Sequence, residues 1–270
     1  MLSITTVNIK SYNNNGYLII RSALSKKECE YFKKKTKNLK PKLKIPYSEV
    51  AWGYGNLINT EPFNKILDKK FLINAAKKII GDNFIYNHLL INNKAAWLGP
   101  DVEFHQEVYN MQTYAPGSVP KKDWRKFMQI FIALDKQSKE NGCLKIIPKS
   151  HKLGILKCED AIGSNLGHKR RTVLKDLNKA YKKFGIKDLE LNQGDAVIFN
   201  HLLIHGSANN VSAEGRMAML LQARMNFLRK NNRILKKETK YRTDFVIKNL
   251  SNKITSLKKR DLYKDFSLKK

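Results

Sequence analysis

The chain has 270 residues, of which 42% are hydrophobic, so it can bury a substantial core and overall disorder is excluded. It carries 52 Lys or Arg residues against 23 acidic residues, which gives a net charge of +29. A field of this sign favours anionic partners, but the basic residues are mostly Lys and are spread along the chain. A coding bias produces the same pattern, and we take this compositional explanation as the default.

The cysteines point to a reducing compartment. Cys29, Cys143 and Cys158 are an odd number at irregular spacing and include no CxxC pair, so neither a disulfide framework nor a zinc site is predicted. The first residues contain no apolar segment typical of a secretory signal, and no apolar run approaches the ~18 residues that span a membrane. We therefore expect a cytoplasmic protein.

The first part of the chain predicts one short strand and two helices. Residues 16–20 are apolar and follow an Asn-rich turn, which indicates a strand. Ser25 and Glu28 have the spacing of a capping box, which predicts a helix beginning at residue 26. Apolar residues recur at helical spacing over residues 61–81, and Gly81 is a suitable end for this second helix.

From residue 82 the pattern changes to short segments that are apolar or alternating, separated by turn-forming residues. Helices followed by strands, with few helix–strand alternations, predict a mainly β or α+β core flanked by helices. The predicted strands cover residues 84–92, 102–109, 127–134, 143–147, 188–199 and 216–228.

The end of the chain is a basic extension. Residues 229–270 hold 15 Lys or Arg residues against four acidic ones. A solvated and partly helical extension is the default interpretation, and an arm that contacts polyanions is the alternative. We therefore predict one domain over residues 1–228, followed by this extension.

Two segments carry residues suited to metal binding. His105 and Glu107 are two positions apart, so on a β-strand they would point to the same side, opposite to Gln106. A His-x-Glu pair alone is common by chance. However, a second segment has a Gly-Asp turn, an apolar stretch, and then His205 and Arg216. Two histidines and one carboxylate form the facial triad of non-haem iron(II) oxygenases, and a buried Arg calls for a carboxylate partner.

These segments resemble the phytanoyl-CoA dioxygenase family of iron(II)- and 2-oxoglutarate-dependent oxygenases. The resemblance extends over roughly residues 10–230. It is carried by FHQE at 104–107, ENGCLKIIPKSHK at 140–152 and GDAVIFNHLLIHGSANNVSAEGR at 194–216. It implies a double-stranded β-helix, which is a jelly-roll or cupin-like core.

The resemblance also implies roles for individual residues. His105, Glu107 and His205 would bind Fe(II), while Arg216 would hold the distal carboxylate of 2-oxoglutarate with the assistance of Ser207.

Gln129 and Phe131 lie on the segment that lines the cosubstrate pocket in members of this family. The implied reaction consumes O2, converts 2-oxoglutarate into succinate and CO2, and hydroxylates a C–H bond.

One residue departs from the family pattern. Glu107 stands where the family usually has Asp, which lengthens the reach of the carboxylate by ~1.5 Å. Relatives that halogenate replace this carboxylate with a small residue, so Glu107 argues against halogenation. His201 lies four residues before His205, which is not a same-face spacing on a strand, and we interpret it as structural.

Three functions remain open from the sequence. The leading one is a hydroxylase of a small molecule, for which basic residues such as Lys121, Lys122, Lys169, Arg170 and Arg171 would suit an anionic substrate. The second is an oxygenase acting on nucleic acid or another macromolecule, favoured by the charge but supported by no recognition motif. The third is a non-catalytic relative of the same fold, which the complete set of site residues makes the least favoured.

Overall fold

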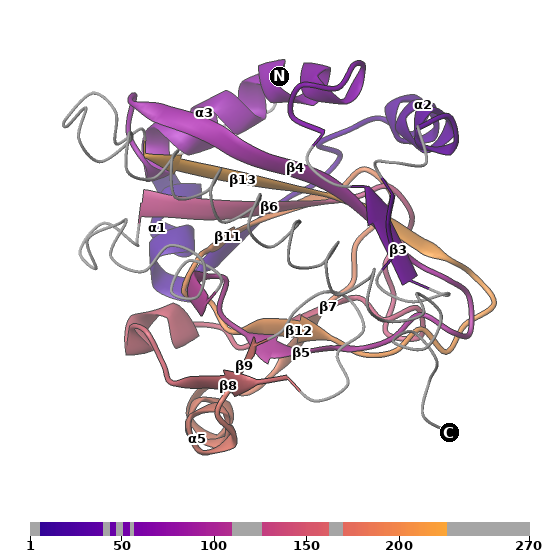
Figure 1. Ribbon diagram of the computed structural model, residues 1–270. Coiled ribbons are helices and arrows are strands. Elements are labelled where there is room, and N and C mark those ends of the chain that lie inside the picture. Colours follow the sequence, from indigo (N-terminus) through magenta and orange to yellow (C-terminus); the bar gives the residue numbers. More distant parts are fainter. Residues whose placement is uncertain are drawn as a thin grey trace, which may run out of the picture. The chain divides into compact units, whose positions relative to one another are not determined.

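A computed structural model describes residues 6–39, 44–46, 51–54, 57–109, 126–161 and 170–225 (Figure 1). The predicted basic extension, residues 229–270, lies outside these ranges, as do Lys121, Lys122 and Lys169. Among the described residues, no helix is both long and apolar enough to cross a membrane.

Two antiparallel sheets form the core. The larger sheet has seven strands, in the order β1 (Tyr17–Ile20), β11 (Ala196–Asn200), β6 (Phe127–Ala133), β13 (Arg216–Met225), β4 (Phe84–Lys94), β3 (Ala51–Tyr54) and β2 (Lys44–Pro46). The smaller sheet has four, in the order β10 (Lys187–Leu189), β7 (Leu144–Ile146), β12 (His205–Ser207) and β5 (Val102–His105). A hairpin of β8 (Cys158–Asp160) and β9 (Arg170–Thr172) completes the β-structure of the described residues.

The inner faces of the two sheets enclose a common apolar core. Phe131 and Phe199 of the larger sheet belong to the same buried cluster as Leu144 and Ile146 of the smaller one. Alternate residues of the larger sheet, such as Met219, point to the opposite face. This two-sheet arrangement is the predicted jelly-roll core, so the expected fold class is confirmed.

Three helices cover the outer face of the larger sheet (Figure 1). They are α1 (Thr6–Asn15), α2 (Lys26–Lys37) and α3 (Lys70–Ile79), which follows the 3-10 helix η2 (Phe63–Asp68). A short 3-10 helix, η4 (Ser150–Leu153), follows β7, and α5 (Leu174–Phe184) packs Ala180 against Ile147 and Ile204 beside the smaller sheet.

Several predicted boundaries were wrong. The predicted helix over 61–81 is divided at Lys69 into η2 and α3, and the Asn-rich segment predicted as a turn is the end of α1. The segment 188–199 forms β10 and β11 in different sheets, because the chain turns at Gly194, whose φ is +88°.

The capping box of α2 is confirmed. The Ser25 side chain accepts a hydrogen bond from the Glu28 backbone N–H, and the Glu28 carboxylate accepts one from the Ser25 N–H. We expect Ser25→Ala to lower the free energy of unfolding by about 1 kcal/mol, measured by urea denaturation. Ser11→Ala, at an exposed position inside α1, is the control and should change little; an equal effect of both would contradict the assigned cap.

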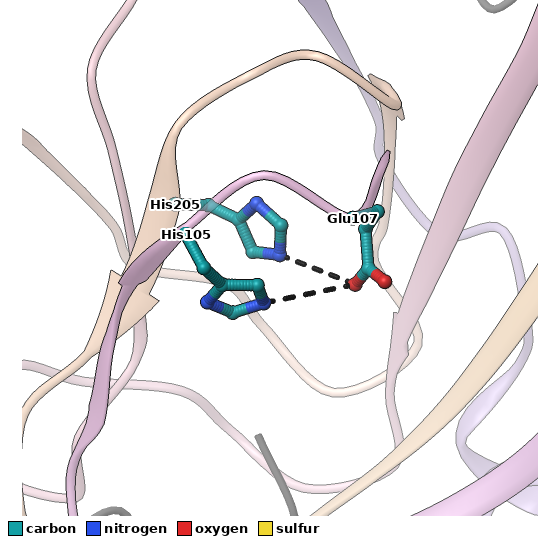
Figure 2. Close-up of side chains that lie close together, drawn as sticks. All are labelled: His105, Glu107 and His205. Atoms are coloured by element: carbon teal, nitrogen blue, oxygen red, sulfur yellow. Dashed lines mark ion pairs between the residues drawn. The ribbon is translucent and has the colours of Figure 1, made fainter. Parts of the chain in front are cut away.

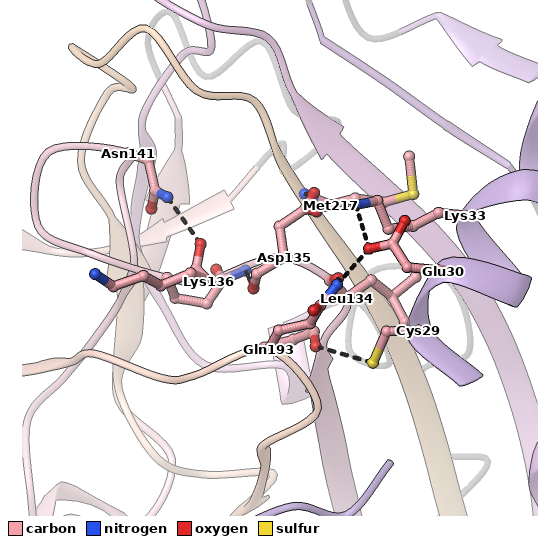
Figure 3. Close-up of polar contacts among 11 residues, drawn as sticks. Cys29, Glu30, Lys33, Leu134, Asp135, Lys136, Asn141, Gln193 and Met217 are labelled. Carbon is pink, nitrogen blue, oxygen red and sulfur yellow. Dashed lines mark hydrogen bonds and ion pairs between the residues drawn. The ribbon is translucent and has the colours of Figure 1, made fainter. Parts of the chain in front are cut away.

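A polar network ties α2 to the start of β13 (Figure 3). Lys33 forms ion pairs with Asp135 at 2.6 Å and Glu30 at 3.0 Å, and Gln193 donates to Glu30 at 2.6 Å. Asp135 also accepts a hydrogen bond from the Met217 N–H at 2.8 Å. Because Met217 follows Arg216 directly, this network fixes the point at which Arg216 enters the sheet.

Candidate metal centre

Three potential metal ligands converge between the sheets (Figure 2). His105 ends β5 and His205 begins β12, and the two residues are cross-strand partners. The carboxylate oxygen Oε1 of Glu107 lies 3.9 Å from Nε2 of His105 and 3.4 Å from Nε2 of His205. The structure therefore brings together all three residues proposed from the sequence.

Backbone carbonyl groups orient both imidazole rings. Nδ1 of His105 lies 2.7 Å from the carbonyl oxygen of Glu103, and Nδ1 of His205 lies 2.9 Å from that of Leu203. A carbonyl oxygen only accepts, so each Nδ1 carries the proton. In the neutral rings, the lone pairs of both Nε2 atoms then face Glu107, as ligation of a metal requires.

Glu107 does not lie on the same strand as His105, contrary to the prediction. Strand β5 ends at His105, and Glu107 occupies the following turn. The predicted opposite direction of Gln106 is confirmed, because its amide donates to the carbonyl oxygens of Leu202 at 2.7 Å and Gly154 at 2.9 Å. These bonds hold the turn, so that Glu107 points back toward the histidines.

The charges at the site suit a cation. Burial alone would raise the pKa of Glu107, but its interactions with His105 and His205 hold it well below its usual range. Burial, with a smaller contribution from His105, lowers the pKa of His205. An ionised carboxylate beside two imidazoles is the donor set of a non-haem iron(II) site. The three residues present therefore fit this metal.

A cationic pair lies at one end of the inner face of the larger sheet. Lys94 and Arg216 are direct cross-strand partners on β4 and β13. Nζ of Lys94 donates to Oγ of Ser207 at 2.8 Å and to the carbonyl oxygen of Ala208 at 2.6 Å. Arg216 donates to the carbonyl oxygen of Gly142 at 2.7 Å. The side chains thus reach from the larger sheet to the loops beyond the smaller one.

No carboxylate among the described residues forms an ion pair with either Lys94 or Arg216, although they are only 1% and 6% exposed. Burial, together with the charge of Arg216, lowers the pKa of Lys94 to about 6, and burial lowers that of Arg216 to about 10. Nε of Arg216 has no hydrogen-bond partner in the described structure. A buried guanidinium with an unused donor calls for an anion, and an anion bound there would favour the protonated form of Lys94. The distal carboxylate of 2-oxoglutarate fits this place.

The other predicted cosubstrate residues differ in position. Ser207 contacts Lys94, and the ring of Phe131 lies 5.5 Å from the Arg216 guanidinium, so both adjoin the cationic pair. Gln129 lies two residues before Phe131 on β6, where its amide contacts His201 at 3.2 Å. The described contacts of Gln129 are therefore with His201, away from the cationic pair.

Lys94 was missed by the sequence analysis. In a chain so rich in Lys, a Lys at the end of an apolar segment resembles many solvated ones. The available signal was its place on the strand, because Asn92 and Lys94 follow Leu90 at alternate positions that share one face of β4. Lys94 is buried only because the loops beside the second sheet cover this end of the strand, which the sequence of β4 does not show.

Comparison with known proteins agrees with this geometry. The family described as "Phytanoyl-CoA dioxygenase (PhyH)" matches residues 12–218. A probable phytanoyl-CoA dioxygenase of Caenorhabditis elegans is 26% identical over 239 residues, covering 77% of this chain and 71% of that protein. An L-proline trans-4-hydroxylase of Streptomyces griseoviridis is 28% identical over 164 residues, covering 56% of this chain and 58% of that protein. The structure of EctD from S. alaskensis with 2-oxoglutarate and 5-hydroxyectoine has a TM-score of 0.65 at 16% identity, and covers 82% of this chain and 76% of that one.

Proposed function

Since the chain belongs to the phytanoyl-CoA dioxygenase family, we propose that it is an iron(II)- and 2-oxoglutarate-dependent dioxygenase that hydroxylates a small molecule. We assign His105, Glu107 and His205 as the ligands of the iron, and Arg216, Lys94 and Ser207 as the residues that hold 2-oxoglutarate. The observation that carries this assignment is the convergence of two histidines and one carboxylate inside a β-core that also buries Lys94 and Arg216 without a described carboxylate partner.

Residues around the site would have distinct roles in this reaction. Iron and 2-oxoglutarate together supply the activation of O2 and the oxidising power for cleaving a C–H bond. The carbonyl oxygens of Glu103 and Leu203 keep both imidazoles in the ligating tautomer. Arg216 and Lys94 bind and orient the distal carboxylate, and Phe131 excludes water beside it.

The assignment is tested by adding Fe(II) and 2-oxoglutarate to the purified protein without oxygen. We expect the weak visible charge-transfer band of the iron–2-oxoglutarate chelate. Admission of air should then yield succinate, and a suitable substrate should increase its rate of formation. If no such band develops with the wild-type protein, the proposal is wrong.

Lys94 provides a separate prediction. Replacing Lys94 with Met should raise the Kd of 2-oxoglutarate by ~10-fold or more, as expected for loss of one charge-assisted hydrogen bond. The same change should stabilise the protein without cosubstrate by about 2 kcal/mol near pH 7, because it removes a buried group that the unfolded chain protonates and the folded chain does not. Calorimetric titration and thermal unfolding measure the two effects.

The pH dependence follows from the same group. The pKa of Lys94 is about 6 in the folded protein without cosubstrate, against 10.5 ordinarily. The unfolded chain binds the extra proton between these values, so the stability contributed by this group rises with pH from about 6 to about 10. A carboxylate favours the protonated amine, so 2-oxoglutarate affinity should fall as pH rises above 6. Lys94→Met should flatten both profiles, and unchanged profiles would contradict the assignment.

For the substrate, we propose a small molecule, as in the relatives named for L-proline hydroxylation and solved with 5-hydroxyectoine. The suggestion that Arg170 and Arg171 hold an anionic substrate gains no support. Arg170 forms an ion pair with Asp160 at 2.6 Å, and Arg171 contacts Glu103 at 3.0 Å and Glu159 at 2.9 Å.

For the compartment, we propose the cytoplasm. Cys29 and Cys143 are buried as free thiols, and Cys158 is free as well, as a reducing environment allows. Fractionation of cells that express the tagged protein tests this location.

A further inference from the structure

Along the inner face of the larger sheet the side chains change from charged to apolar to polar. The polar end, opposite to Arg216, bears on the substrate of the proposed function. Beyond the cationic pair lies an apolar stretch that includes Phe131. Beyond that lie four polar side chains, which we call the polar band: His201, Gln129, Gln222 and Asn87. Gln129 and Gln222 are cross-strand partners, and the amides of Asn87 and Gln222 are hydrogen-bonded.

The space in front of this face is open in part. Leu90, Leu220 and Gln222 lie on the central strands β4 and β13, yet each is partly exposed. Their neighbours Leu89 and Leu221, which point to the helices, are at most 1% exposed. On these two strands, the residues that face the helices are buried, whereas the residues that face the smaller sheet are partly exposed. Accessible space must therefore lie next to the inner face.

His201 is the most constrained member of the polar band. It follows β11 and is 0% exposed. Its ring stacks on Phe127, with centroids 4.9 Å apart and an interplanar angle of 27°. The side-chain amide of Gln129 donates to its Nδ1 at 3.2 Å. The ring is therefore held from one side by an aromatic face and from another by a hydrogen bond.

This hydrogen bond selects the tautomer. Because Nδ1 accepts, the proton of the neutral imidazole resides on Nε2. Burial, with a smaller contribution from His205, lowers the pKa of His201 to about 4, so the ring is neutral at ordinary pH. Nε2 is buried, and no atom of the described structure accepts its hydrogen. A buried donor without an acceptor is costly unless a ligand supplies one.

His201 contacts other residues of the inner face than the proposed cosubstrate residues do. Phe127, on which His201 stacks, is the cross-strand partner of Arg224, eight residues beyond Arg216 on β13. The described contacts of the Arg216 side chain are with Gly142 and Phe131, whereas His201 contacts Phe127 and Gln129. Glu107 and His205, by contrast, are near enough to act on the pKa of His201. His201 thus lies near the metal centre, and its described contacts are separate from those of Arg216 and Lys94.

We propose that Nε2–H of His201 binds an oxygen acceptor of the substrate, such as a carbonyl or carboxylate oxygen, and so positions the carbon to be hydroxylated. The inference rests on the proposed function and adds a substrate class: a polar molecule with a hydrogen-bond acceptor close to the reacting carbon. Oδ1 of Asn87, a buried acceptor without a donor in the described structure, suits an N–H or O–H group farther along the same molecule. A hydrocarbon chain would leave both groups without partners.

The first test is the tautomer, which needs no substrate. In the protein loaded with zinc and 2-oxoglutarate and labelled with ¹⁵N-histidine, NMR should find His201 neutral and protonated on Nε2. The second test uses acetamide as the probe. Crystals of the iron–2-oxoglutarate complex, soaked in acetamide without oxygen, should place its carbonyl oxygen about 3 Å from Nε2 of His201.

Variants separate substrate binding from other roles of this histidine. His201→Phe keeps the aromatic stacking and removes the donor, so acetamide should be absent from this place. His201→Gln retains an N–H donor and should bind the probe again, and His151→Phe, outside the β-core, is the control. Fe(II) and 2-oxoglutarate should bind to His201→Phe as to the wild type. The charge-transfer band measures this binding without acetamide.

Three outcomes would overturn the proposal. One is a proton on Nδ1 instead of Nε2. Another is acetamide that is absent from Nε2 in the wild type or equally present in His201→Phe. The third is weaker iron binding in His201→Phe, which would mean that His201 positions the metal ligand Glu107 and does not bind the substrate. Absence of the charge-transfer band in the wild type would instead count against the proposed function.

Discussion

Replacing His205 with alanine should abolish iron binding at physiological metal concentrations and reduce succinate formation to background. Structural zinc sites contribute roughly 10–16 kcal/mol from four ligands, so one ligand is worth about 3 kcal/mol, or ~10²-fold in metal affinity. We expect a loss of this size here, because His205 is one of only three proposed protein ligands. Anaerobic titration with Fe(II) in the presence of 2-oxoglutarate measures the change.

The control for this variant is His151→Ala. His151 lies in η4, and its Nε2 contacts the carbonyl oxygen of Asn13 at 3.1 Å, away from the metal centre. Its replacement should leave the charge-transfer band and succinate formation intact. A His205→Ala protein that still developed the wild-type band would show that the iron is held elsewhere.

Arg216→Ala should separate cosubstrate binding from metal binding. Truncating one partner of a buried, hydrogen-bonded charge pair costs 2–5 kcal/mol, so the Kd of 2-oxoglutarate should rise by ~10²-fold or more. The proposed iron ligands lie on β5, on β12 and in the turn after β5, and make no described contact with Arg216, so the Kd of Fe(II) should remain near the wild-type value. Separate calorimetric titrations with Fe(II) and with 2-oxoglutarate measure the two Kd values.

Arg216→Lys is the matched variant, because it keeps the charge but loses the planar fork that a carboxylate engages through two hydrogen bonds. Its affinity for 2-oxoglutarate should fall between those of the wild type and Arg216→Ala. If Arg216→Ala lost iron and 2-oxoglutarate to the same extent, the arginine would be structural and our assignment would be wrong.

The predictable part of the fold comprises elements with strong local signals. The capping box of Ser25 and Glu28 marked the start of α2, and the apolar run at 127–134 marked β6, which is buried throughout. Helix α1 could not be read in this way. Its sequence, TVNIKSYNNN, contains β-branched residues and asparagines that disfavour helices. Packing of Tyr12, which is 2% exposed, stabilises it within the core.

The metal ligands were predictable as residues but not as a geometry. His105, Glu107 and His205 followed from residue type and family resemblance, whereas the turn that carries Glu107 depends on bonds from Gln106 to segments about 50 and 100 residues away. For the same reason Lys94 was missed and His201 was interpreted as structural only. Their burial and partners arise only where strands distant in the chain become neighbours.

The buried pair of Lys94 and Arg216 would also make the stability of the folded protein depend on the concentration of 2-oxoglutarate. A ligand that binds only the folded state stabilises it by about 2.7 kcal/mol at a hundred times its Kd, and here that ligand would be 2-oxoglutarate seated on Lys94 and Arg216. When cosubstrate is scarce, a larger fraction of molecules would open and be exposed to proteases. The cellular half-life of the protein would then depend on the supply of 2-oxoglutarate. A shortage of cosubstrate would lower the amount of the protein as well as its rate of turnover.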